Sequence, residues 1–153
     1  MSIICSFAKL SQSELDSVIK NPSKFDSEKI DFDFDIDKAW EIIHFLITNS
    51  VENSSELSPI WSLQGFEFGE EEDWLNCINS QKVKTISKTL EAMDETWFKA
   101  NFVNENLEGK NLYGYDYNTF EEECEYYWFH LQELTEYFAI AADQNLAIIN
   151  YIA

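Results

Sequence analysis

The chain has 153 residues, of which 29 are acidic and ten are basic, so its formal net charge is −19. This length fits one domain, and the apolar content of 45% with 16% aromatic residues excludes a disordered acidic tail. All ten basic residues are lysines, and a strongly negative chain without arginine is a poor match for nucleic acid, anionic membranes or nucleotides. No apolar run approaches the roughly 18 residues of a membrane-spanning helix. We therefore expect no nucleic-acid and no membrane partner, and the composition favours cationic ones.

The N-terminal part predicts a strand followed by a helix. Residues 2–10 form a short apolar run, which is typical of a strand. Ser11 and Glu14 have the spacing of a capping box, which predicts that a helix begins there. Asn21-Pro22 predicts its end, because the residue before a proline is disfavoured in helical conformation.

Residues 31–36 alternate aspartate with an apolar residue, and this period of two predicts an extended segment. Asp35 or Asp37 is expected to cap a following helix that ends near Asn49. Residues 49–58 are polar and predict a loop.

The middle of the chain predicts four further elements. Residues 60–63 are expected to form a short helix closed by Gly65, residues 66–68 a strand, and residues 70–73 an exposed turn. An amphipathic helix is then predicted from apolar residues at helical spacing, namely Val83, Ile86, Leu90 and Met93.

The C-terminal part predicts the longest helix. Thr119 and Glu122 have capping-box spacing. Apolar residues then recur at steps of three and four over about 24 residues, which predicts a core helix: Phe120, Cys124, Tyr127, Leu131, Leu134, Phe138 and Ala141. Residues 146–152 predict a closing strand that can pair with the first. The sequence thus predicts a single α+β domain over residues 1–153, with a small sheet that includes the N- and C-terminal strands, packed against several helices.

Residues 35–40 read Asp-Ile-Asp-Lys-Ala-Trp and are followed by His-Phe-Leu at residues 44–46. This stretch, with both ends of the chain, resembles the YfbM-like family of small bacterial α+β proteins. The family's loop before the middle amphipathic helix usually contains glycine and tyrosine, which residues 73–79 lack. The resemblance implies the fold and supplies no catalytic activity. Related sequences among proteins that protect bacteria from secreted toxins imply an immunity role.

Nothing in the sequence has the spacing of a catalytic or cofactor site. There is no glycine-rich phosphate loop and no nucleophile elbow, so we predict no cofactor and no catalytic residue. The three cysteines, Cys5, Cys77 and Cys124, form no Cys-x-x-Cys pair and predict reduced thiols in a cytoplasmic protein.

Metal binding is also not predicted. Asp31, Asp33, Asp35 and Asp37 are spaced like the start of an EF-hand loop, but the glycine position holds Ile36. His130 has Glu133 one turn later, without the further nitrogen or sulfur ligands that a transition metal needs.

The surplus of negative charge lies in two separate segments. Residues 31–75 hold twelve acids and one lysine, and residues 111–153 hold eight acids and no lysine, so these segments carry −11 and −8 and account for the whole −19. Acidic and aromatic residues adjoin in both, which is common at recognition surfaces. The predicted partner-binding residues are Asp31, Asp33, Glu70, Glu71, Glu72, Asp73, Trp74, Glu121, Glu122, Glu125, Tyr126 and Trp128.

The sequence therefore favours a non-enzymatic module that presents one acidic face to a basic protein, such as an immunity-type inhibitor that occludes a toxin. The alternative is a small-molecule enzyme or sensor that uses His44 in a pocket under Trp40. A third possibility is an acidic domain without a dedicated partner.

Overall fold

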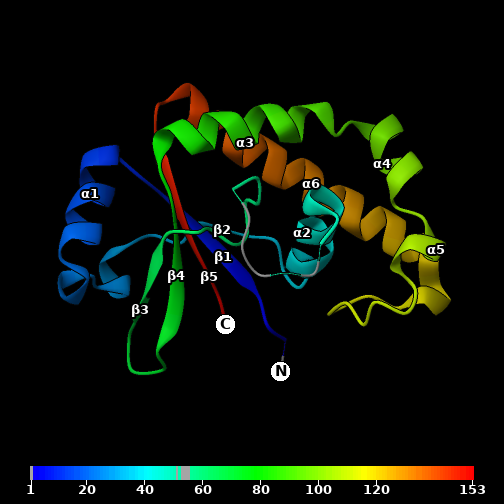
Figure 1. Cartoon of the computed structure of the whole chain (residues 1–153), viewed down its shortest axis with the longest axis horizontal. Coiled ribbons are helices and arrows are strands. Elements are labelled where there is room, and N and C mark those ends of the chain that lie inside the picture. Colours follow the sequence, from blue (N-terminus) through cyan, green and yellow to red (C-terminus); the bar gives the residue numbers. More distant parts are fainter. Residues whose placement is uncertain (1, 51, 53–55) are drawn as a thin grey trace.

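The computed structural model describes residues 2–50, 52 and 56–153, and Figure 1 shows how their strands and helices are arranged. The strands are β1 (Cys5–Leu10), β2 (Phe34–Asp35), β3 (Gly65–Phe68), β4 (Asp73–Ile78) and β5 (Ala147–Ile152). The α-helices are α1 (Gln12–Lys20), α2 (Trp40–Thr48), α3 (Ser80–Ala92), α4 (Glu95–Asn101), α5 (Asn104–Leu107) and α6 (Phe120–Asp143). The 3-10 helices of the described residues are η1 (Pro22–Lys24), η2 (Ser27–Lys29) and η3 (Tyr117–Thr119).

The five strands form one antiparallel sheet in the order β2-β1-β5-β4-β3. The first and last long strands pair along their full length, from Cys5 opposite Ile152 to Leu10 opposite Ala147. The predicted pairing of the terminal strands is therefore confirmed, as is the α+β class of this single domain. The last strand of the chain, β5, lies in the centre of the sheet and joins β1 to β4.

Helices cover the two faces of the sheet unequally. The larger core lies between the sheet and α3, α6, α2 and α4, and its centre includes Phe7, Tyr127 and Phe138. On the opposite face, α1 and the segment that follows it cover a smaller core around Leu15, Leu75 and Ile149. β4 was not predicted because its buried residues 75–78 include the polar Asn76, so they form neither an alternating pattern nor a continuous apolar run.

Several local predictions are confirmed. The capping box of Ser11 and Glu14 begins α1, with each side chain accepting a hydrogen bond from the other residue's backbone N–H. α6 has the predicted 24 residues, and its apolar stripe faces the larger core. Within the described residues, no helix is both long enough and apolar enough to cross a bilayer.

The predicted helix at residues 60–63 is wrong. The backbone N–H of Ser62 donates to Asn76 Oδ1 (3.0 Å), and its hydroxyl donates to the carbonyl of Cys77 (2.7 Å). These bonds hold the segment beside β4 without regular secondary structure, and Gly65 begins β3 instead of ending a helix. The buried side chains of Asn76 and Asn150 are bonded to each other, and Asn150 also donates to the carbonyl of Pro59.

Two predicted helix caps are also wrong. α2 begins after Ala39 without a side-chain cap, because the Asp35 carboxylate accepts the N–H of Asp37 within the preceding turn. Thr119 does not cap α6, because its hydroxyl bonds to the carbonyl of Asp116 and to Glu123. In both places the side chain that the sequence predicted as a helix cap instead forms a hydrogen bond within the turn before the helix.

Candidate functional site

The solvent-facing side of α6 is strongly acidic. Its nine exposed residues follow one another mostly at steps of three and four, so they lie on one side of the helix. We call this surface the α6 ridge; its members are Glu121, Glu122, Glu125, Phe129, Gln132, Glu133, Glu136, Ile140 and Asp143. Six of them are carboxylates and none is basic. Phe129 and Ile140 interrupt the charge with side chains that are 55% and 40% exposed.

The aspartate segment, residues 31–37, lies along one flank of α6. The Tyr137 hydroxyl donates to Asp33 Oδ1 (3.0 Å), and the Tyr126 hydroxyl donates to Asp37 Oδ2 (2.7 Å). The ring of Phe34 stacks on Tyr137 with 4.5 Å between centroids. These contacts bring the first acid-rich segment of the sequence against the second.

Burial and the neighbouring carboxylates keep these phenols protonated. Burial is the first cause that raises the pKa of Tyr126, and the hydrogen bond to Asp37 is the second. The pKa of Tyr137 is raised by burial and then by the charge of Asp33. Both hydroxyls therefore remain hydrogen-bond donors near neutral pH.

Few lysines balance this surface. The Nζ of Lys9 lies 4.9 Å from the ring centroid of Tyr137, and Lys38 is close enough to Glu123 to oppose the rise in its pKa that burial causes. Among the described residues, the ion pairs are Lys29 with Asp26 and Lys99 with Glu95. The lysines of α3 therefore form no ion pair with the described carboxylates of the ridge.

His130 lies between the ridge and the aspartate segment. Its ring packs against Tyr126 with 4.6 Å between centroids, and its Nδ1 is buried without a hydrogen-bond partner among the described residues. Burial lowers the pKa of His130, while the charges of Asp37, Asp35 and Glu133 oppose that shift.

The predicted residues of the β3–β4 hairpin do not join this surface. Glu70, Glu71 and Glu72 lie exposed in the turn, and Asp73 and Trp74 begin β4. Trp74 is 46% exposed. Figure 1 shows the hairpin extending from the sheet away from α6. The two acidic regions are therefore separate.

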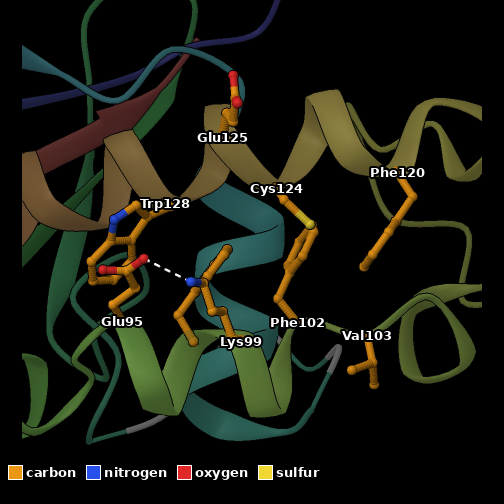
Figure 2. A pocket seen from close by; sticks show the side chains of 9 residues that line it. Glu95, Lys99, Phe102, Val103, Phe120, Cys124, Glu125 and Trp128 are labelled. Carbon is orange, nitrogen blue, oxygen red and sulfur yellow. Dashed lines mark ion pairs between the residues drawn. The ribbon is translucent and has the colours of Figure 1, made fainter.

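A pocket opens on the other flank of α6, where the helix faces α4 (Figure 2). Its volume is about 360 Å³, and the predicted residues Glu125 and Trp128 line it together with Cys124. The remaining lining residues are Glu95, Phe98, Lys99, Phe102, Val103 and Phe120. Glu125 belongs both to the ridge and to the wall of this pocket, so the two surfaces are continuous.

His44 does not form an open site. It is fully buried, its Nδ1 lies 2.6 Å from the Ser58 hydroxyl, and its Nε2 lies 2.5 Å from the carbonyl oxygen of Glu52. The ring of Trp61 packs edge-on against it at 4.6 Å, and burial lowers the pKa of His44. Trp40 is also buried, and its indole N–H donates to the carbonyl of Ile3. This burial argues against His44 as a general base.

The family model described as "Domain of unknown function (DUF1877)" matches residues 1–151. The chain belongs to this family. The fold is also similar to the crystal structure of YfbM from Escherichia coli, a protein of unknown function, with a TM-score of 0.71 over 98% of this chain and 99% of that one. Sequence identity is 14%, so this likeness establishes the fold alone. No curated protein matches the chain. The predicted YfbM-like resemblance is thus confirmed.

Sequence reasoning missed part of the site in this DUF1877 protein. It did not select Glu133 or Glu136, although their spacing from Glu125 and Phe129 repeats the helical period and could have identified them. The contribution of α4, through Glu95 and Lys99, had no signal in the sequence, because it depends on how two helices pack. Among the described residues, no group of three or more histidine, cysteine or acidic side chains is placed to hold a metal ion.

Proposed function

We propose that this DUF1877 protein is a non-enzymatic module that binds a basic protein on the α6 ridge and the adjoining aspartate segment. The observation that carries this proposal is the meeting of two acid-rich segments: the exposed carboxylates of α6 and the aspartates that Tyr126 and Tyr137 hold beside them. In an immunity-type inhibitor, such a surface would cover the basic active or binding site of a toxin.

Physical chemistry supports this use of the ridge. A surface of one charge sign raises the rate at which an oppositely charged partner associates, by about 10- to 1,000-fold. Phe129 and Ile140 supply exposed apolar groups within the acidic surface, and interfaces commonly combine buried aromatic anchors with a polar rim. Inhibition by covering requires no reaction, which agrees with the sealed environment of His44.

We infer a cytoplasmic location from the cysteines. Cys5, Cys77 and Cys124 are all free thiols, and Cys5 and Cys77 lie buried in different strands. Free thiols are usual where the surroundings are reducing.

Charge-reversed variants test the proposal. Glu133→Lys with Glu136→Lys alters the ridge, and Glu70→Lys with Glu71→Lys alters the hairpin by the same number of charges. Each variant and the unaltered chain would serve as bait in the native cell lysate at low salt, with quantitative mass spectrometry of the captured proteins. We expect a basic protein that the unaltered chain and the hairpin variant retain and the ridge variant loses.

The captured protein then allows a kinetic test with purified components. Screening shortens the range of electrostatic attraction to about 8 Å at physiological ionic strength, so the association rate should fall steeply as salt is added. An association rate that does not change with salt, or a ridge variant that binds as well as the hairpin variant, would show the proposal to be wrong.

A further inference from the structure

The pocket between α4 and α6 has a wall of stacked aromatic rings. The ring of Phe98 lies 5.3 Å from Trp128 and 4.9 Å from Phe102, and Phe102 lies 5.4 Å from Phe120. The planes of the last two pairs are within 13° and 12° of parallel. Because these rings already support one another, the pocket presents preformed apolar surface. Its volume of about 360 Å³ lies within the range of about 300–1,000 Å³ that is usual for ligand pockets.

The polar groups stand at the rim. Glu95 and Lys99 pair with each other at 2.9 Å, and both side chains are mostly exposed (Figure 2). Glu125, on the α6 side, has no ion-pair partner among the residues that the structure describes. Figure 2 shows the Glu125 carboxylate pointing away from the pocket interior, on the ridge side of α6. The pocket therefore offers an apolar interior, and a carboxylate that can receive a cation lies outside it, at the ridge.

We propose that this pocket receives an aromatic side chain that the basic partner carries next to a lysine or arginine. The inference rests on the proposed function, because Glu125 makes the pocket continuous with the α6 ridge. Charge complementarity selects the occupant: the aromatic ring fills the apolar interior while its cationic neighbour lies against Glu125. Buried aromatic anchors of this kind carry much of the binding energy in protein interfaces.

Cys124 provides a direct reporter of pocket occupancy. It lines the pocket and is partly exposed, whereas Cys5 and Cys77 are buried. A thiol reagent added to the folded protein should therefore label Cys124 first, and an occupant should slow that labelling. Burial raises the pKa of Cys124, so the assay is best run at mildly alkaline pH, where more of the thiol is ionised.

Two blocked pentapeptides test the inference: Lys-Lys-Trp-Lys-Lys and Lys-Lys-Ala-Lys-Lys. Both carry the same charge, and only the first has an aromatic group. By mass action, labelling of Cys124 should slow about tenfold when the tryptophan peptide is present at roughly ten times its Kd. The alanine peptide should protect far less at the same concentration, and Glu125→Gln should weaken protection by the tryptophan peptide.

A substitution that fills the pocket gives a second, independent test, which uses the captured partner. Val103→Trp places a large ring at the pocket wall, and Leu63→Trp adds the same ring to an exposed residue of a loop. With folding of both variants checked by circular dichroism, we expect Val103→Trp to lose the partner and Leu63→Trp to retain it.

The outcomes separate this inference from the proposed function. If the ridge variant loses the partner while Val103→Trp keeps it, the ridge binds and the pocket inference is wrong. Equal protection by the two peptides, or no protection by either, also overturns the pocket inference. If neutral N-acetyltryptophanamide protects Cys124 as well as the tryptophan peptide does, the pocket binds a free aromatic molecule and the proposed occupant is wrong. A ridge variant that binds normally overturns the proposed function itself.

Discussion

The α6 ridge and the β3–β4 hairpin look alike in sequence and differ in their support. Each places several acids next to tryptophan or tyrosine. The ridge adjoins a second acidic segment that is 104 residues away in sequence and is held by the bond from Tyr137 to Asp33. The hairpin is local, and the two residues that flank its turn, Phe68 and Asp73, face each other in the register of neighbouring strands. The ridge is thus a composite surface, whereas the hairpin is an acidic turn.

The largest expected effect concerns the attachment of the aspartate segment. Tyr137→Ala removes a buried ring that stacks on Phe34 and contacts Phe7. Replacing a buried aromatic residue by alanine costs about 3–5 kcal/mol, and urea unfolding would measure this loss. The hairpin counterpart, Trp74→Ala, should cost about 1 kcal/mol or less, because much of that side chain is already in water. Equal losses at the two positions would remove the distinction between the regions.

The second prediction tests the local support of the hairpin. A Cβ added at Gly65 would lie 2.3 Å from the carbonyl oxygen of Leu75 and 2.6 Å from the Trp74 indole nitrogen. A backbone carbonyl within a strand pair cannot move aside easily, so Gly65→Ala should destabilise the protein by about 1–3 kcal/mol. Glu67→Ala, an exposed change in the same strand, is the control.

Hydrogen exchange would locate the effect of Gly65→Ala. Faster exchange should be confined to β3 and its partner β4, while exchange along residues 31–37 stays unchanged. Faster exchange along residues 31–37 would show that the hairpin and the ridge are coupled, and would contradict the view that the hairpin is supported only locally.

Local sequence patterns predicted those elements whose side chains alternate between core and solvent. The apolar stripe from Tyr127 to Ala141 predicted α6, because one side of that helix faces the core and the other faces water. β4 escaped prediction because the buried Asn76 interrupts its apolar residues, so its sequence shows neither a period of two nor the continuous apolar run that predicted β5.

The failure at residues 60–63 has its physical cause in tertiary hydrogen bonds. Asn76 and Cys77 take up the polar groups of Ser62, and this contact across 14 and 15 residues keeps the segment from becoming a helix. The same holds for the site: the acids of α6 could be found from their spacing, but the placement of Asp33 and Asp37 depends on Tyr137 and Tyr126. Local sequence patterns do not predict which tyrosine will form a hydrogen bond with which aspartate.

The third prediction removes one of those bonds. Tyr126→Phe keeps the ring and deletes the hydroxyl that donates to Asp37 at 2.7 Å. We expect a loss of about 0.5–1.5 kcal/mol and faster hydrogen exchange in residues 31–37. Tyr117→Phe, at a half-exposed tyrosine of η3, is the matched control. Unchanged exchange in the aspartate segment would mean that the stacking of Phe34 on Tyr137 suffices to hold it.

The smallest expected effect is a pH dependence of stability that arises from His130, beside the ridge. Burial lowers the pKa of His130 in the folded protein, although Asp37, Asp35 and Glu133 oppose this shift. In the unfolded chain the pKa of a histidine is near 6.5. As pH falls through that value the unfolded chain binds a proton more readily than the folded protein, so stability declines on acidification. The buried His44 acts in the same direction, whereas Glu123, whose pKa is raised by burial, acts in the opposite direction at lower pH.

His130→Gln should therefore make the decline between about pH 7 and pH 5 shallower without abolishing it, because His44 remains. Unfolding in urea at a series of pH values and constant ionic strength would measure the two slopes. If the slopes are equal, the aspartates and Glu133 compensate fully for the burial of His130, and the folded protein then protonates His130 over the same pH range as the unfolded chain. That result would add one positive charge beside the ridge at acidic pH, and the contrast with the hairpin would still lie in their structural support.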